Sequence, residues 1–358
     1  MHGLFRRVVK LLAILAFALP ACPSLAQNLP ALGADLTRTT VSGLSSGAYM
    51  AGQFQVAYSR LVTGAGLVAG GPYGCARTPG TELNPFFTVV VQLNQARALN
   101  QCMKYGWPFL GLGVPDPADL AHYAKRLAAD QRIDPLEALQ GDKVYIFSSS
   151  NDGTVKSRVV EAALGFYREL GMPEANISFV THKDAAHSFL TEGTTPECGN
   201  DDPPFLNGCG YDQAKAILQR LHGTLQEARP AMEANFLRFK QGEFLSGLSG
   251  TEFGDIGIAY IPVECRNPVQ PACAVHVVFH GCRQGLGEVQ EQFVKGSGYA
   301  RWAEGNRIIL LFPQIRTTVS NLKGCWDWWG YTGPHFLERD APQMVAIKRM
   351  IDRLAAAP

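Results

Sequence analysis

The feature that most constrains the fold is a glycine-flanked serine close to the start of the chain. Residues 43–47 read Gly-Leu-Ser-Ser-Gly and follow directly on a strand-like run at residues 36–41. A G-x-S-x-G segment between a strand and a helix makes a sharp turn that lifts its central serine above the edge of a sheet. Side chains at the two glycine positions would collide as the helix folds back on its strand. The segment therefore predicts Ser45 as an exposed nucleophile, followed by a buried helix at residues 48–58.

The rest of the chain alternates between strand-like and helical patterns, which predicts an α/β fold with a mostly parallel central sheet. The strand-like runs are at residues 66–70, 143–147, 177–180, 256–262, 274–279 and 307–312. The helical patterns are at residues 117–129, 155–170, 211–229 and 341–355. No repeat, low-complexity tract or linker divides these elements, so we expect one catalytic domain over residues 27–358.

Residues 1–26 have the pattern of a secretory signal peptide. Three basic residues precede an apolar stretch at residues 11–19, and small residues at 24–26 form a cleavage site. The apolar stretch is too short for a transmembrane helix. Lipidation at Cys22 is the alternative. We therefore expect cleavage near Ala26 and export to the periplasm or the medium, without stable insertion into a membrane.

Charge gives no indication of a nucleic-acid partner. The chain has 32 basic and 31 acidic residues, and loss of the leader would remove three basic residues and no acidic ones. Nucleic-acid-binding domains carry a marked basic patch or stripe, which a slightly acidic mature chain does not suggest. We expect no nucleic-acid partner and a monomeric protein.

The cysteine count agrees with export. Of nine cysteines, Cys22 leaves with the leader, and an even number in an exported chain indicates disulfides. Pairing of neighbours along the chain gives Cys75–Cys102, Cys198–Cys209, Cys265–Cys273 and Cys282–Cys325. On the order of a hundred other pairings are possible. Because no C-x-x-C or histidine pair has metal-ligand spacing, we expect no metal site.

A serine nucleophile needs a histidine base and an acid that orients the histidine. In chains with this turn, the acid and then the histidine follow the serine, each in a loop beyond a strand. Asp152 follows the run at residues 143–147, and His187 follows the run at residues 177–180. We therefore predict Ser45, Asp152 and His187 as the catalytic residues.

Neighbouring residues offer alternatives to this assignment. Asp152 itself lies in an Asn-Asp-Gly segment and would suit an ordinary turn. Asp184 is a rival acid, although its closeness to the histidine suits a loop cap better. His182 is a rival base, but it still belongs to the end of a strand. Ser46 is the next candidate nucleophile after Ser45.

A histidine-glycine pair late in the chain predicts the second half of an oxyanion hole. Such a hole takes one N–H from the residue after the nucleophile, here Ser46, and one from a loop beyond another strand. Residues 279–282 read Phe-His-Gly-Cys, which offers the N–H of Cys282, unless this is only a turn that ends the strand. This motif normally precedes the serine, but here it follows the histidine. We therefore predict a circularly permuted α/β-hydrolase fold, whose usual front strands lie in the last third of the chain.

Aromatic residues are concentrated in one glycine-flanked segment, residues 324–333, which holds three of the five tryptophans. One interpretation is a packed cluster beside Cys325. The other is an apolar wall for an acyl or polymer chain. The candidate substrate-binding residues are Trp326, Trp328 and Trp329, with Tyr105 and Trp107 as additions.

Taken in order, these motifs resemble the extracellular short-chain-length polyhydroxyalkanoate depolymerases with a circularly permuted (type 2) catalytic domain. The matching segments are residues 41–49, 70–76, 151–155, 186–189, 280–282 and 324–326. The resemblance implies serine-dependent hydrolysis of esters in poly(3-hydroxybutyrate), related short-chain polyhydroxyalkanoates or their oligomers through an acyl-enzyme. It implies no cofactor and a polyester or oligoester as substrate. It also assigns the roles given above to Ser45, Asp152, His187, Ser46 and Cys282.

Many members of that family carry a linker and a separate polymer-binding domain, and we expect neither in this chain. Soluble oligomers, amorphous polymer or other short-chain esters are then the expected substrates. Two alternatives stay open. One is a secreted carboxylesterase for non-polymeric esters, such as feruloyl or acetyl esters, and the other is a non-catalytic polymer-binding protein that kept a hydrolase fold.

Overall fold

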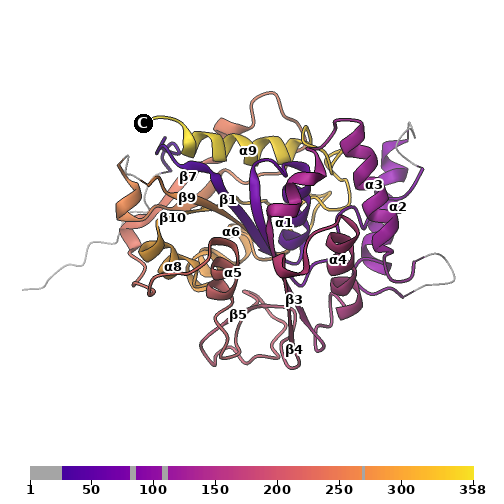
Figure 1. Ribbon diagram of the computed structural model, residues 1–358, viewed down its shortest axis with the longest axis horizontal. Helices are drawn as coiled ribbons and strands as arrows, with labels where there is room; N and C mark the ends of the chain where they lie inside the picture. Colours follow the sequence, from indigo (N-terminus) through magenta and orange to yellow (C-terminus); the bar gives the residue numbers. More distant parts are fainter. Residues whose placement is uncertain (1–25, 81–85, 107–111, 268–270) are drawn as a thin grey trace, which may run out of the picture.

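A large mixed sheet between two layers of helices forms the centre of the protein (Figure 1). The computed structural model describes residues 26–80, 86–106, 112–267 and 271–358. The strands of this sheet are β1 (Asp35–Leu44), β2 (Val62–Val68), β3 (Lys143–Ser149), β4 (Ile177–His182), β7 (Phe236–Lys240), β8 (Ile256–Tyr260), β9 (Ala274–Phe279) and β10 (Ile308–Phe312). A separate pair consists of β5 (Phe189–Thr191) and β6 (Leu206–Gly208).

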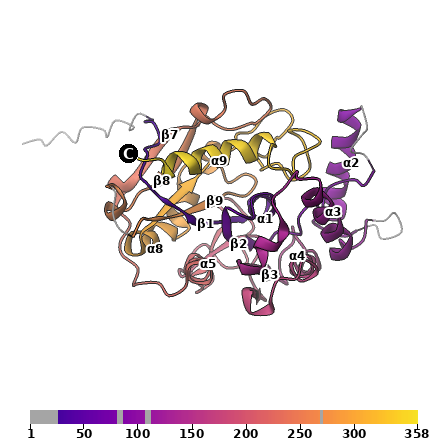
Figure 2. The same cartoon turned by 45° about the horizontal axis from the view of Figure 1, so that its top comes forward.

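The helices of the described residues fall into two groups along the chain. The first half contributes α1 (Ser46–Ala57), α2 (Phe87–Asn100), α3 (Pro117–Ala129) and α4 (Ser157–Glu169). The second half contributes α5 (Gln213–His222), α6 (Leu286–Val289), α7 (Gln292–Gly296), α8 (Tyr299–Asn306) and α9 (Pro342–Ala355). Two views place α2 and α3 at one end of the molecule, and β7 and α8 at the other (Figures 1 and 2).

Strand order confirms the mostly parallel sheet. The order is β4-β3-β2-β1-β9-β10-β8-β7. Neighbours from β4 to β10 run parallel, and only β8 and β7 at one edge join in antiparallel fashion. Early strands lie on one side of β1 and late strands on the other. The end of the chain thus completes the sheet around the first strand, as the permuted motif order predicts.

The register of the central strands explains why the two predicted motifs meet. Gly43, near the end of β1, lies opposite Phe279, the last residue of the parallel strand β9. Loops that follow parallel strands leave the sheet at the same edge. The turn at Ser45 and the loop at residues 280–282 therefore emerge side by side, although more than two hundred residues separate them in the sequence.

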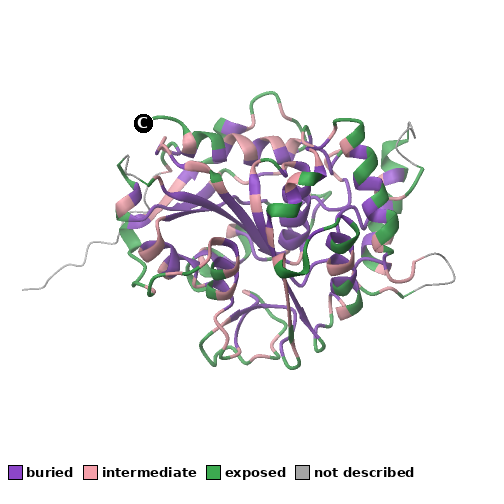
Figure 3. Ribbon diagram, viewed as in Figure 1, coloured by how far each residue is buried: buried purple, intermediate pink, exposed green. Residues whose placement is uncertain are grey.

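Each face of the sheet has its own apolar core. One core joins α1, α3, α4 and α9, and the other joins α5, α7 and α8. The inner strands between them are buried along most of their length (Figure 3), as expected for a parallel sheet covered on both faces, whereas the edge strands β4 and β7 are mostly half-buried. All 12 residues of α1 are buried, so this helix lies inside the protein and shows no polar face.

Several element boundaries differ from the predictions. The helix predicted at residues 117–129 is α3, where Pro117 is the first residue and the Asp116 side chain accepts the Ala118 N–H at 2.9 Å. The pattern at residues 211–229 gives only α5, which ends at His222 and is followed by Gly223 with a φ of 86°. The strand predicted at residues 66–70 begins earlier, as β2. The described elements that were not predicted are α2, α6, α7, α8, β5, β6 and β7.

The helix α2 was not predicted because many of its apolar side chains are exposed, so they do not form one apolar face at helical spacing. Only Val90, Asn94 and Ala98 are buried in it, whereas Phe87, Val89, Leu93 and Leu99 are exposed. Within the described residues, no helix combines the length and apolar character that a bilayer crossing requires. The predicted leader lies outside the described residues, apart from Ala26.

Four disulfides link neighbouring cysteines along the chain, in the pairing that the sequence suggested. They are Cys75–Cys102, Cys198–Cys209, Cys265–Cys273 and Cys282–Cys325. Two of them lie near the helix that follows Ser45, because Cys75, Cys102 and Cys325 belong to one small apolar cluster with Tyr49, Trp328 and Trp329.

Candidate active site

Ser45 lies at the tight turn between β1 and α1, where the backbone has an unusual conformation. Its φ is 58° and its ψ is −120°, a strained combination for a residue with a side chain. The turn is held by the Ser45 N–H, which donates to the Val68 carbonyl at 2.9 Å. A Cβ at Gly43 would lie 2.3 Å from the Gly47 carbonyl carbon, and one at Gly47 would lie 2.2 Å from the Phe279 oxygen. Both flanking glycines are therefore required by backbone contacts.

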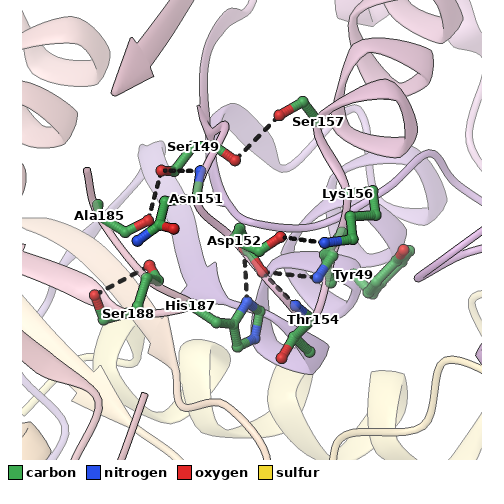
Figure 4. A network of polar contacts seen from close by, with 12 residues as sticks. Tyr49, Ser149, Asn151, Asp152, Thr154, Lys156, Ser157, Ala185, His187 and Ser188 are labelled. Atoms are coloured by element: carbon green, nitrogen blue, oxygen red, sulfur yellow. Dashed lines mark hydrogen bonds and ion pairs between the residues drawn. The ribbon is translucent and has the colours of Figure 1, made fainter. Parts of the chain in front are cut away.

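Asp152 and His187 form a buried pair (Figure 4). The Asp152 Oδ2 accepts from His187 Nδ1 at 2.8 Å. Its Oδ1 accepts the backbone N–H groups of Thr154 at 2.7 Å and Val155 at 2.8 Å. Asp152 is 2% exposed and His187 is 6% exposed. The carboxylate is thus fixed by the backbone of its own loop, and the histidine is held through Nδ1 with Nε2 left for proton transfer.

The rival acid and base occupy a different part of the loop. The His182 Nδ1 accepts the backbone N–H groups of Asp184 and Ala185, each at 3.1 Å. The Asp184 side chain is exposed, and its backbone carbonyl accepts from the Asn151 side chain at 3.0 Å. These two residues therefore cap the loop that precedes His187.

Three of the five predicted catalytic and oxyanion residues line one cavity of about 510 Å³, and Asp152 and Ser46 do not. Ser45, His187 and Cys282 line it, with Gly281 beside them. Asp152 lies behind His187. Ligand sites of proteins commonly enclose about 300–1,000 Å³, so the cavity has the size of a small-molecule or short oligomer site.

The histidine of the His-Gly motif has a structural role. Burial lowers the pKa of His280 to about 4, so its ring is neutral near neutral pH. Its Nδ1–H donates to the Gly281 carbonyl at 2.7 Å, and its Nε2 accepts the Ile315 N–H at 3.1 Å. The Gly281 N–H donates to the Gln284 side chain at 2.7 Å. The loop that carries Cys282 is therefore held rigidly at the edge of the cavity.

Two of the predicted tryptophans form a wall of the cavity. Trp328 and Trp329 line it, and their rings meet edge to face at 5.8 Å. Trp328 also stacks on Tyr49, with ring centroids 4.2 Å apart. Tyr49 lies four residues after Ser45, one helical turn along α1, and itself lines the cavity. Sequence reasoning missed Tyr49, although this spacing was a usable signal.

The structure corrects two of the aromatic predictions. Trp326 is fully buried in the main core, where it packs against Phe279 at 4.9 Å and Phe253 at 5.7 Å, and it does not line the cavity. Its side chain packs toward the sheet, whereas those of Trp328 and Trp329 line the cavity. Tyr105 is half-buried beside Arg158 and is not a wall residue. Trp107 lies outside the described residues.

The remaining walls come from segments without a recognisable motif. Leu99 of α2, Phe205, and the exposed pair Val319 and Leu322 border the cavity. Among the described residues, the one histidine-cysteine group close enough to hold a metal is His182 with Cys198 and Cys209. These two cysteines are bonded to each other, so neither offers a thiolate ligand.

The chain is similar to polyester-degrading enzymes over most of its length. No family model matches it. It is 39% identical to the poly(3-hydroxybutyrate) depolymerase of Delftia acidovorans over 92% of its own length, but spans only 62% of that relative. It is 31% identical to the polyhydroxybutyrate depolymerase of Talaromyces funiculosus, covering 95% of this chain and 96% of the relative.

Two solved structures that resemble this chain are also PHB depolymerases. One is a PHB depolymerase from Penicillium funiculosum, with a TM-score of 0.77 and 30% identity. The other is a serine-to-alanine variant of a PHB depolymerase complexed with an R3HB trimer, with a TM-score of 0.77 and 29% identity. Each match covers 92% of this chain and 99% of the other chain.

Proposed function

The chain belongs to the poly(3-hydroxybutyrate) depolymerase family, and on this premise we propose that it hydrolyses ester bonds in poly(3-hydroxybutyrate) and its oligomers. The observation that carries the proposal is the meeting of Ser45 and His187 at one cavity, with His187 held by a buried carboxylate. This is the arrangement that turns a serine hydroxyl into a nucleophile.

The reaction follows from the positions of these groups. Ser45 Oγ attacks the ester carbonyl while His187 Nε2 takes its proton. The imidazolium then protonates the departing alcohol, which leaves an acyl group on Ser45. Water activated by His187 cleaves this acyl-enzyme, releases the acid and restores the serine. Asp152 keeps the proton on Nδ1 and stabilises the imidazolium in both steps.

The charge that develops on the carbonyl oxygen needs N–H donors. Ser46 is the first residue of α1, and the N–H groups of a first helical turn have no acceptor inside the helix. The positive end of the helix dipole also points toward an anion at this place. We assign the second donor to Cys282, which lines the cavity just beyond the end of the neighbouring strand β9 and is tethered by Cys325.

The chemistry of the walls supports an aliphatic polyester as substrate. Rings of Tyr49, Trp328 and Trp329 and the side chains of Leu99 and Phe205 face the cavity. Such a surface suits a chain of methyl and methylene groups, since burial of apolar area is favourable at about 25 cal/mol per Å². The four disulfides fit an oxidising compartment, and we include export with leader cleavage after Ala26 in the proposal.

Product analysis on the soluble 3-hydroxybutyrate trimer and on a poly(3-hydroxybutyrate) suspension tests this function. We expect shorter acids from the trimer and clearing of the suspension. Release of ferulate from a feruloyl ester without trimer cleavage would instead support a carboxylesterase. Binding to the polymer without turnover of any ester would support a non-catalytic polymer-binding protein.

Covalent labelling by a fluorophosphonate identifies the nucleophile. Ser45→Ala should abolish labelling without loss of folding, whereas the matched variant Ser46→Ala should keep it, because alanine retains the backbone N–H. The Ser46 hydroxyl is buried without a hydrogen-bond partner in the described structure. Labelling that persists in the Ser45 variant and vanishes in the Ser46 variant would reverse the assignment.

A further inference from the structure

A buried carboxylate, Asp327, lies directly before the two tryptophans of the cavity wall. It is 1% exposed. Five donors surround its two oxygens. Oδ1 accepts the N–H groups of Trp329 at 3.3 Å, Gly330 at 2.6 Å and Tyr331 at 3.0 Å, and Oδ2 accepts the N–H of Thr332 at 2.9 Å and its hydroxyl at 2.6 Å. The carboxylate thus folds the next five residues around itself.

These contacts suit an ionised acid that has no cation beside it. None of the ion pairs among the described residues involves Asp327. Burial raises its pKa, while the donors of Thr332, Gly330 and Tyr331 oppose that change. An ionised carboxylate only accepts hydrogen bonds, so five converging donors match it, and an amide in its place would turn an NH₂ toward some of them.

The turn around Asp327 is also tied to the helix of the nucleophile. The Asp327 carbonyl accepts from the Gln53 side chain at 2.8 Å, and its N–H donates to the Gln343 side chain at 3.0 Å. Gln53 lies in α1, which begins directly after Ser45, and Tyr49 of the same helix stacks on Trp328. The position of the wall is therefore fixed relative to the nucleophile.

Other contacts hold the segment that precedes Asp327 in the sequence. The disulfide holds Cys325 to Cys282, and the Asn321 side chain pairs with the backbone N–H and carbonyl of Cys325 at 2.9 and 2.8 Å. Beyond Asp327, the backbone turns at Gly330 with a φ of 88°. The direction of Trp329, and of the turn that follows it, thus depends on the carboxylate.

We propose that Asp327 is a positioning residue for substrate: it holds Trp328 and Trp329 in the orientation that receives the oligoester chain next to Ser45. This inference rests on the proposed function and deepens it. Asp327 does not touch the reacting atoms. Loss of the Asp327 carboxylate should weaken the binding of an oligoester that is long enough to reach Trp328 and Trp329. It should not change the turnover of an ester that is too short to reach them.

Steady-state kinetics of Asp327→Asn on two substrates tests this role. For the 3-hydroxybutyrate trimer we expect KM to rise about tenfold with kcat within about twofold, the pattern of lost ground-state binding. For p-nitrophenyl acetate, which engages only the catalytic residues, we expect kcat/KM within about twofold of the wild type. Thr332→Val removes one of the five donors and keeps the shape, so it should raise the KM for the trimer by a smaller factor.

Glu304→Gln is the matched control for loss of a buried carboxylate. Glu304 lies in α8, away from the cavity, and accepts from Asn235 at 2.8 Å and Tyr260 at 2.5 Å. We expect this variant to be less stable with an unchanged KM for the trimer.

The outcomes separate this inference from the proposed function. Equal losses on both substrates, or an unchanged KM for the trimer in the Asp327 and Thr332 variants, would overturn the positioning role and leave the depolymerase function intact. If Asp327→Asn does not fold, the Thr332→Val result alone decides. A wild-type protein that turns over p-nitrophenyl acetate but never the trimer would overturn both.

Discussion

The His187 imidazole donates its Nδ1 proton to the Asp152 carboxylate at 2.8 Å, and both residues are buried. The second oxygen of Asp152 is already taken by two backbone N–H groups of its own loop. The orientation of the histidine is therefore set by the fold of residues 152–155 before any substrate binds. Preorganisation of this kind removes the need to reorient a base during the reaction.

Asp152→Asn should keep the fold and nearly abolish activity. The amide oxygen can still accept from Thr154 and Val155, which turns the NH₂ toward His187 Nδ1. Nδ1 must then accept a hydrogen bond through its lone pair, so the single proton of the neutral ring sits on Nε2 and His187 cannot act as a base. We expect kcat to fall on the order of 10⁴-fold with little change in Tm, measured by ester turnover and thermal unfolding. A loss below tenfold would contradict the proposed role of the carboxylate.

Much of the fold and the predicted triad could be deduced from the sequence because each part has a local signal. The turn at residues 43–47 needs glycines for backbone reasons, and the acid and histidine each follow an apolar strand-like run. The direction of a side chain in a loop has no such signal. Trp326 and Trp328 lie two residues apart in the same aromatic segment. Trp326 nevertheless packs in the core, whereas Trp328 lines the cavity.

Other parts depend on contacts between distant segments. The wall residue Leu99 belongs to α2, whose exposed apolar side chains give no pattern of burial on one face. The five donors to Asp327 lie only two to five residues further along the chain, but nothing in the sequence shows that they all turn toward one carboxylate. By contrast, the late position of Cys282 could be interpreted in advance, since loops after parallel strands meet at one edge.

Gly47→Ala should destabilise the protein strongly. The new Cβ would lie 2.2 Å from the Phe279 oxygen and 2.6 Å from the His280 oxygen. Both atoms belong to the backbone at the end of β9, which cannot move without disturbing the sheet. We expect a loss of about 3 kcal/mol or more in the free energy of unfolding, at the upper end of overpacking costs.

Denaturant unfolding compares the free energies of unfolding of Gly47→Ala and of the control variant Gly242→Ala. A Cβ at Gly242 meets nothing within 4 Å, so that substitution should change stability by less than about 1 kcal/mol. Equal stabilities of the two variants would show that the close approach of α1 to β9 is not required.

Trp326→Ala should mainly reduce stability, whereas Trp328→Ala should mainly weaken substrate binding. Removal of Trp326 leaves a cavity in the main core, at an expected cost of about 3–5 kcal/mol in the free energy of unfolding. Removal of Trp328 takes away the partner of Tyr49 at the wall of the active-site cavity. We expect it to raise the KM for the 3-hydroxybutyrate trimer with a smaller loss of stability. Trimer kinetics and urea unfolding of both variants check this contrast, and an unchanged KM in Trp328→Ala would contradict it.

Asp142→Asn should stabilise the protein more at alkaline than at acidic pH. Burial raises the pKa of Asp142 from 3.8 to about 7, against the effect of the Gln55 side chain, which donates to it at 2.8 Å. In the unfolded chain this acid ionises near pH 4. Between these two values the folded protein binds the extra proton, so its stability falls as pH rises from about 4 to about 7. Asparagine carries no charge and removes this dependence.

Thermal unfolding of both proteins at pH 5 and pH 8.5 measures the effect. The difference in Tm, variant minus wild type, should be larger at pH 8.5, because there the wild type must keep a buried charge beneath α1. His276 and His280, which burial keeps neutral, are the same in both proteins, so their titration cancels in this difference. A difference that is equal at both pH values, or larger at pH 5, would mean that Asp142 is already ionised in the folded protein under acidic conditions.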